Sequence, residues 1–159
     1  MAATHWTGPL QAGSILNTSG TTIGSDVANV GWVMMSQSSA VAQATNVSSA
    51  GVYKTGIVIP ANSQIVSIKL FKTTAWDGVA QTINVGVDTT ATQLAVAGDN
   101  NASTTLGLLE IVPGNDATRT GKWLDVGTAD VQIYTKSTNT GSGVGVLVVN
   151  YVQARDLTP

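Results

Sequence analysis

Residues 81–88 read Gln-Thr-Ile-Asn-Val-Gly-Val-Asp, and this stretch decides the fold class. Ile83, Val85 and Val87 alternate with polar or small residues. A period of two is typical of a strand that has one face in a core and the other in solvent. Helical periodicity, by contrast, is essentially absent from the sequence. The stretch therefore predicts a half-buried β-strand.

Similar short apolar stretches lie on both sides of this one, separated by turn signals. Residues 64–73 alternate in the same way, and Asp77-Gly78 then supplies a turn dipeptide, which predicts a hairpin with residues 81–88. Upstream, residues 52–59 end at Pro60, which cannot donate to a strand ladder. Further strands are predicted at residues 106–112, 122–126 and 130–136. Many short strands with frequent turns indicate an all-β domain, an antiparallel β-sandwich or jelly roll over residues 30–159.

The last predicted strand, residues 144–154, is apolar on both faces. Val146 and Val148 face one way, while Leu147 and Tyr151 face the other. Such a strand is expected in the centre of a sheet, or covered on its second face by another subunit or by the N-terminal segment. The glycine-rich residues 141–145 precede a strand rather than a helix, so they are interpreted as a hairpin connection and not as a phosphate loop.

The alternation predicts which side chains form the core. One face of each strand is assigned to it by period two. The predicted core residues are Val66, Ile68, Leu70, Ile83, Val85, Val87, Val131, Ile133, Val146 and Val148.

Residues 1–29 differ from the rest of the chain. Glycine, proline, serine and threonine are frequent there, and no apolar period is sustained. The segment is predicted to be an extended N-terminal arm with too few apolar groups for a core of its own. Its apolar side chains then need a partner surface, so the predicted partner-binding residues are Trp6, Pro9, Leu10, Ile15 and Leu16.

Composition excludes several classes of function. Charged residues are only 10% of the chain and the net charge is −2, and the lysines and arginines are scattered, so nucleic-acid binding is not expected. There is no cysteine for a disulfide or a thiolate metal site. The first residues lack the basic and apolar regions of a signal peptide, and no apolar run approaches the roughly 20 residues that span a bilayer. Low charge is typical of surfaces buried in assemblies, and we expect a homo-oligomer, most simply a trimer.

The sequence gives no indication of an enzyme. The acidic residues lie singly, and the one histidine, His5, falls in the predicted arm, so no acid/base pair is recognisable. Asp88, Asp99 and Asp116 lie near turns but lack the spacing of a calcium loop, and are interpreted as turn-forming side chains that bind the local backbone. No catalytic residue, cofactor or metal is therefore predicted.

The four tryptophans leave two interpretations open. Trp32 alternates with apolar neighbours and is predicted to lie in the core, whereas Trp76 and Trp123 stand in or near turns, where their rings could be exposed. Exposed rings form sugar-binding platforms in many β-sandwich modules, and they also anchor protein interfaces. Anchoring is the preferred interpretation, including for Trp6 in the arm, and a carbohydrate-binding module is the alternative.

Three stretches carry a resemblance to a known group. They are residues 5–10 (HWTGPL), 59–66 (IPANSQIV) and 145–151 (GVLVVNY). Together they resemble small virion proteins of tailed bacteriophages, which commonly have a Gly-Pro arm, a proline turn that leads into a Val/Ile-rich strand, and a final apolar strand that ends on an aromatic.

The resemblance implies a structural role in the virion. The role it implies is that of a capsid decoration, or cement, protein: a β-sandwich, often trimeric, that binds the outside of the head and connects major capsid subunits through its arm. It further implies synthesis in the host cytoplasm and a final location on the capsid surface. A tail, fibre or head–tail component is the alternative within the same group.

Overall fold

The computed structural model describes residues 34–43, 52–78, 81–100, 102, 105–138 and 141–152 with side chains, and the backbone of residues 11–16 and 28–32. The elements, in chain order, are β1 (Gln11–Leu16), β2 (Ala28–Trp32), β3 (Met34–Ala42), β4 (Val52–Ile59), β5 (Gln64–Thr74), β6 (Ile83–Gly86), β7 (Gly107–Ile111), α1 (Ala117–Leu124), β8 (Val131–Ser137) and β9 (Val144–Val152). The predicted all-β fold is confirmed.

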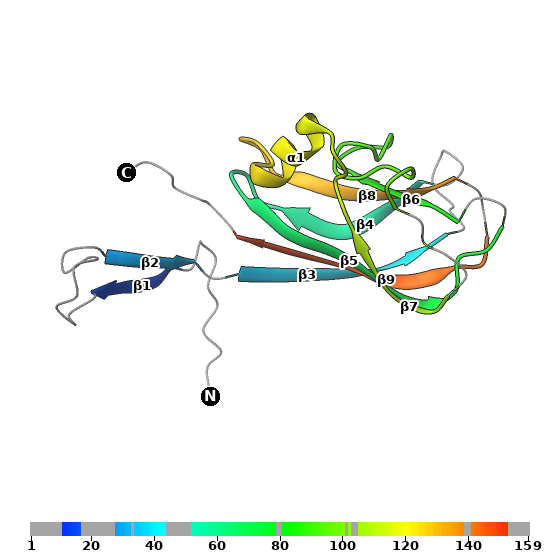
Figure 1. Cartoon of the computed structure of the whole chain (residues 1–159), viewed down its shortest axis with the longest axis horizontal. Coiled ribbons are helices and arrows are strands. Elements are labelled where there is room, and N and C mark those ends of the chain that lie inside the picture. Colours follow the sequence, from blue (N-terminus) through cyan, green and yellow to red (C-terminus); the bar gives the residue numbers. More distant parts are fainter. Residues whose placement is uncertain are drawn as a thin grey trace.

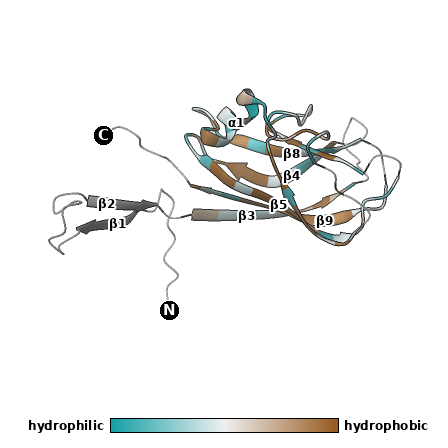
Figure 2. Ribbon diagram, viewed as in Figure 1, coloured by the Kyte–Doolittle hydropathy of each residue, from teal (hydrophilic) through white to brown (hydrophobic). Residues whose placement is uncertain are grey.

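Two antiparallel sheets form the body of the molecule (Figure 1). The four-stranded sheet has the order β3-β9-β5-β7 and the three-stranded sheet the order β4-β8-β6. A bridge between Val85 of β6 and Ala95 adds the position of an eighth strand beside β6. From β3 onward each strand lies in the other sheet from the strand before it, except at the step from β6 to the bridge at Ala95. This alternation is the topology of a jelly roll, which consists of two Greek keys. Figure 2 shows the apolar residues concentrated in the strands of both sheets.

The core lies between these sheets and confirms half of the predicted list. Ile68, Leu70, Ile83, Val85 and Ile133 are all buried, whereas Val87 and Val131 are only partly buried and pack against the core. The three remaining predictions, Val66, Val146 and Val148, are wrong, and each has a local cause.

A β-bulge explains Val66. In the pairing of β5 with β9, Ile65 lies opposite Tyr151 and Ser67 opposite Asn150, so Val66 is the extra residue. A bulge shifts the alternation by one residue. Ile65 therefore joins Ile68 in the core, and Val66 is 47% exposed.

Strand β9 lies in the centre of its sheet, as predicted, but with the opposite face inward. It pairs with β3 on one side and β5 on the other. Leu147, Val149 and Tyr151 are buried, and Val146 and Val148 are half-buried on the outer face of the sheet. Both faces are apolar, so alternation alone could not choose between them; the larger side chains leucine and tyrosine fill the interior.

Both predicted hairpins are wrong, because both connections cross between sheets. β5 belongs to the four-stranded sheet and β6 to the three-stranded sheet, and the same holds for β9 and β8. The two crossings meet in one network. The buried Gln43 amide donates to Asp77 O at 2.7 Å and accepts from the backbone N–H of Asp77 at 2.9 Å and of Gly143 at 3.2 Å. A Cβ on Gly143 would lie 2.7 Å from the Trp76 ring, so only glycine fits there.

The predicted strand at residues 122–126 is wrong because a short helix occupies much of it. The Asp116 carboxylate caps α1 by accepting the Arg119 N–H at 2.9 Å, and Gly127, at φ +110°, follows the helix end. The capping carboxylate is an ordinary start signal, and the helix ends at Asp125, whose N–H donates to Gly121 O. The helix has only eight residues and no fully buried side chain, so it offers few apolar positions from which a period could be recognised.

Side chains join the edge of one sheet to the edge of the other. β3 and β4 are edge strands of the two sheets. The Gln37 amide donates to Val58 O at 2.6 Å and accepts from Val58 N–H at 3.1 Å, so it pairs with β4 as a backbone unit would. Ser39 Oγ also accepts the Gly56 N–H at 3.0 Å. These bonds occupy backbone groups that an open sheet edge would leave for another strand.

The stretch that was predicted to be an extended arm contains most of a hairpin. β1 pairs antiparallel with β2, with Gln11 opposite Trp32 and Leu16 opposite Ala28. This hairpin lies beyond the start of β3, outside the two packed sheets (Figure 1). The division into an arm over residues 1–29 and a domain over residues 30–159 stays a prediction.

Candidate interaction surface

The predicted partner-binding residues fall largely outside the described part of the chain. This is true of Trp6, Pro9 and Leu10, and of any structure around them. Ile15 and Leu16 lie on β1, where their backbones pair with Asn29 and Ala28. Their role in binding a partner remains a prediction.

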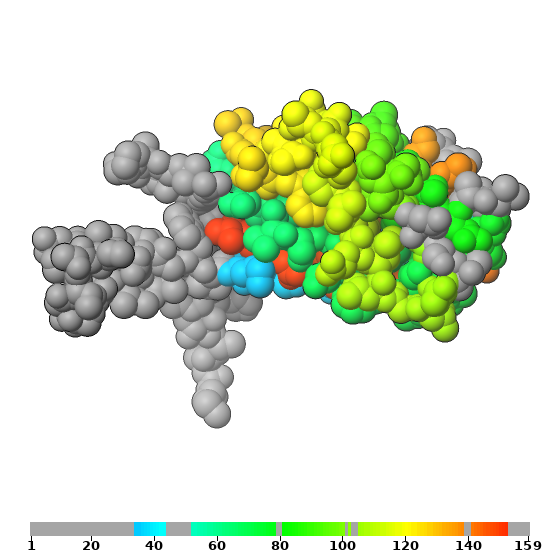
Figure 3. Space-filling view, viewed as in Figure 1, coloured from blue at the N-terminus to red at the C-terminus, as the bar shows by residue number. Residues whose placement is uncertain are grey.

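The described residues do present an apolar row on the outer face of the four-stranded sheet. Strand register places Ala40, Val146, Phe71 and Leu108 side by side across β3, β9, β5 and β7. Phe71 is 44% exposed and Leu108 50% exposed. We call these four residues the outer row. Val144 and Leu106, both exposed, extend the apolar surface beyond it, and β7 lies on the face of the molecule seen in Figure 3.

The charge beside the outer row is balanced. The next row across the sheet holds Lys69 of β5 opposite Glu110 of β7, and their side chains form an ion pair at 3.5 Å. On β9 and β3 the same row continues with Val148 and Ser38. A neutral apolar surface that spans four strands is suited to contact with another protein, because its burial costs little desolvation.

One residue of this surface, Phe71, could have been recognised from the sequence. On residues 64–73 the face opposite the core was identified by Ser67 and Lys69, and Phe71 continues that face. A phenylalanine in an otherwise polar, solvent-facing series marks an exposed contact. The outer position of Val146 could not be predicted, because both faces of β9 are apolar and the alternation does not show which one points outward.

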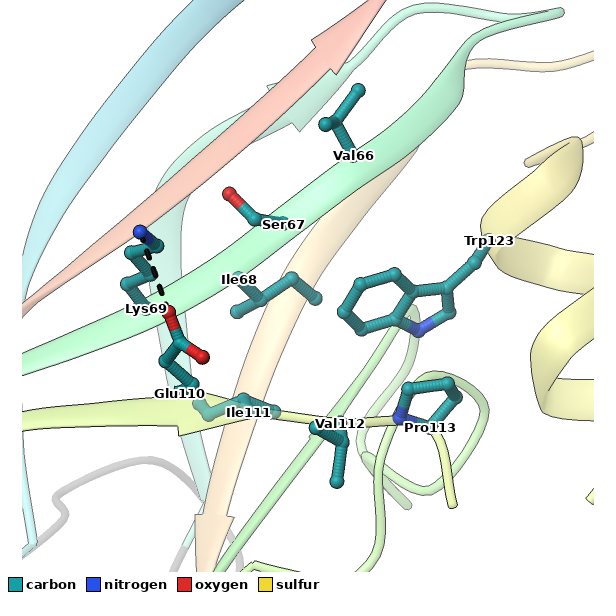
Figure 4. Close-up of a pocket in the computed structure, with 9 residues that line it drawn as sticks. All are labelled: Val66, Ser67, Ile68, Lys69, Glu110, Ile111, Val112, Pro113 and Trp123. Atoms are coloured by element: carbon teal, nitrogen blue, oxygen red, sulfur yellow. Dashed lines mark ion pairs between the residues drawn. The ribbon is translucent and has the colours of Figure 1, made fainter. Parts of the chain in front are cut away.

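A small pocket of about 180 Å³ opens where β7 ends beside the bulge of β5 (Figure 4). Ile68 and Ile111 are its buried members, and Val66 and Val112 are exposed at 47% and 44%. The Trp123 ring forms one wall and is held in place because its Nε1 donates to Leu94 O at 2.9 Å. The pocket is thus preformed and mainly apolar, with Ser67 and the Lys69–Glu110 pair among its lining residues.

The two tryptophans whose side chains are described do not match the predicted exposure. Trp76, expected near the surface, is 1% exposed and donates from Nε1 to Ser137 Oγ at 3.2 Å. Trp123 is half-buried in the pocket wall. The side chains of Trp6 and Trp32 lie outside the described residues. The rings that are described therefore form no paired sugar platform.

The aspartates near turns bind their surroundings in two ways. Asp88 accepts from the Thr90 N–H at 2.7 Å and Asp116 caps α1, so the predicted role in local backbone bonding is confirmed for both. Asp99 instead pairs with the Arg119 guanidinium at 3.2 Å, which ties its turn to α1. In the part of the chain that the structure describes, no three histidine, cysteine or acidic side chains are grouped as metal ligands would be.

Among the described residues, two carboxylates and one amine have shifted pKa values. Hydrogen bonds from Ser142, at 2.6 Å from Oγ and 3.0 Å from N–H, lower the pKa of Asp77, and those from Thr90 lower that of Asp88. Burial lowers the pKa of Lys72, whose amine donates to Ala102 O. Each group is bound within a loop or the interior, so these shifts report on stability. Among the described residues, no helix has the length and apolar character needed to cross a bilayer.

The fold and the outer row define a class: a jelly-roll β-sandwich that presents an apolar sheet face. No family model matches the chain, and no curated protein matches it. Among solved structures, a chain of the cyanophage Pam1 capsid asymmetric unit is similar over 97% of this chain and 92% of its own, with 15% sequence identity and a TM-score of 0.41. At this identity and TM-score, the similarity supports no conclusion about function.

Proposed function

We propose that this chain is a structural virion protein of a tailed bacteriophage, a capsid decoration protein that binds the outside of the head and stabilises contacts between major capsid subunits. The observation that carries the proposal is the outer row: Phe71 and Leu108 lie exposed on the face of a neutral sheet. Apolar side chains in such a position are stabilised when another protein covers them.

Two further observations support this role. The jelly roll is an architecture that viral capsid domains use, although lectins and enzymes use it as well, so the fold alone does not decide the function. The stretches at residues 5–10, 59–66 and 145–151 resemble those of small phage virion proteins. The arm residues Trp6, Pro9, Leu10, Ile15 and Leu16 are proposed to contact the major capsid protein or a neighbouring copy in a trimer.

The proposal is tested by mass spectrometry of purified virions. A decoration protein is expected in many copies per particle, in a fixed ratio to the major capsid protein. Presence in only a few copies would instead indicate a tail, fibre or head–tail component, and absence would overturn the virion role. A glycan array on the isolated protein tests the carbohydrate-binding alternative, for which the described tryptophans give no support.

The contribution of the arm is tested by truncation. A variant that lacks residues 1–16 is expected to keep the melting temperature of the sandwich but to lose to the intact protein in competition for heads. Equal occupancy would contradict the role of the arm, and failure to fold would place the arm in the core.

A further inference from the structure

The pocket beside the β5 bulge has the size and chemistry of a receptor for one aromatic side chain. A cavity of about 150 Å³ with apolar walls can hold benzene, and this pocket measures about 180 Å³. Its exposed walls, Val66 and Val112, have apolar area that a ring would cover. Because Trp123 is fixed by its bond to Leu94, little ordering would be needed on binding.

Strand register places Gln11, the first residue that the structure describes, near this end of the sheet. Gln11 pairs with Trp32, which precedes Met34 by two residues, so Gln11 lies close to the start of β3. Met34 lies opposite Val152, which in turn lies opposite Gln64, two residues before Val66. With strands about 4.8 Å apart and about 3.4 Å per residue, the pocket lies on the order of 20 Å from Gln11.

Reach and ring chemistry together select one side chain. Five extended residues span about 17 Å, and an indole adds several ångströms, so Trp6 can enter the pocket from Gln11. Leu10 and Pro9 are too close to Gln11 to do so. Trp6 is also the only aromatic residue before β1, and residues 1–10 contain no acidic residue, lysine or arginine that would have to be desolvated.

We propose that in the free subunit residues 1–10 dock on their own domain, with the Trp6 ring in the pocket formed by Val66, Ile68, Ile111, Val112, Pro113 and Trp123. This docking does not depend on the role in the virion. It concerns the segment before it meets a partner surface, and it assigns a site to a residue that the sequence only marks as apolar and exposed.

Site-directed disulfide formation tests the proposal. The sequence contains no cysteine, so only the two introduced cysteines can form a disulfide. The full chain carries Thr7→Cys beside Trp6 and Val112→Cys on the pocket rim, and is oxidised mildly at low micromolar concentration. An intramolecular disulfide is expected, read by non-reducing electrophoresis and mass spectrometry. The matched control adds Trp6→Ala, which keeps the length of the segment but removes the indole ring. In this control the disulfide should form at least about tenfold more slowly.

Each other outcome overturns the proposal. Equal rates with and without Trp6→Ala would show random contact of a tethered segment, and no disulfide would show that the segment lies elsewhere. A product that is mainly a disulfide-linked dimer would show that the pocket receives the segment of a second copy. None of these results bears on whether the protein occurs in virions.

Discussion

At the scale of single residues, the bulge in β5 separates two valines that the sequence makes equivalent. Val85 is fully buried between the sheets, whereas Val66 is 47% exposed. Val85→Asp would bury an unpaired charge and is expected to prevent folding. Val66→Asp places the same charge in solvent and should change the free energy of unfolding by about 1 kcal/mol or less. Thermal denaturation of both variants checks this, and equal losses would contradict the register of β5.

The Asp77 carboxylate gives a residue-scale test of pH dependence. Hydrogen bonds from Ser142 hold its pKa below the ordinary value. A lowered pKa in the folded state stabilises the fold above the unfolded pKa of about 3.9, and this contribution is lost as the pH falls through the lowered value. The wild type should therefore melt above Asp77→Asn at pH 7, with the difference shrinking below about pH 4. A difference that is the same at pH 7 and pH 3 would contradict the assignment.

At the scale of elements, the Gln37 amide tests how the sheet edges are joined. Its bonds to Val58, and the bond from its Nε2 to the Tyr151 hydroxyl at 2.8 Å, connect β3 with β4 and β9. Gln37→Leu keeps the approximate volume but removes these bonds, and should cost about 1–3 kcal/mol. Ser36→Ala on the outer face of β3 is the control and should be nearly neutral. Chemical denaturation measures both, and a neutral Gln37→Leu would show that the edge junction adds no stability.

The elements also show what the sequence could and could not predict. Strands such as β6 and β8 were predictable because their alternation is local. Three other features were not predictable, because each depends on pairing between residues far apart in the chain. They are the exposed position of Val66, the choice of which face of β9 points inward, and the crossings between sheets at Asp77 and Gly143. Helix α1 was not predictable from its capping residue Asp116, because a single turn signal does not distinguish the start of a helix from a loop.

The apolar, weakly charged character of the candidate site was predictable from the sequence, but its location on the fold was not. Low charge and an apolar final strand indicated contact with other proteins, and the central position of β9 is confirmed. The outer row could not be assembled from the sequence, because Phe71 and Leu108 become neighbours only when β5 pairs with β7. The pocket likewise requires the bulge, the end of β7 and α1 to meet.

At the scale of the whole molecule, the exposed apolar surface bears on self-association. We expect a homo-oligomer, most simply a trimer, because neutral apolar faces are stabilised by mutual burial. Sedimentation at micromolar concentration should show a species larger than the monomer. A monomer at every accessible concentration would contradict association of the free protein, while leaving assembly on a head to be measured separately.

The most direct test of the central claim is binding of the Phe71→Ser, Leu108→Ser double variant to phage heads that lack the protein. Both side chains are exposed, so the melting temperature should stay close to that of the wild type. Buried interface anchors contribute about 2 kcal/mol or more, so the affinity for heads should fall by about thirtyfold or more. Leu124→Ser, which changes a leucine of α1 that is 53% exposed, is the control and should bind as the wild type does. Undiminished binding by the folded double variant would contradict the account.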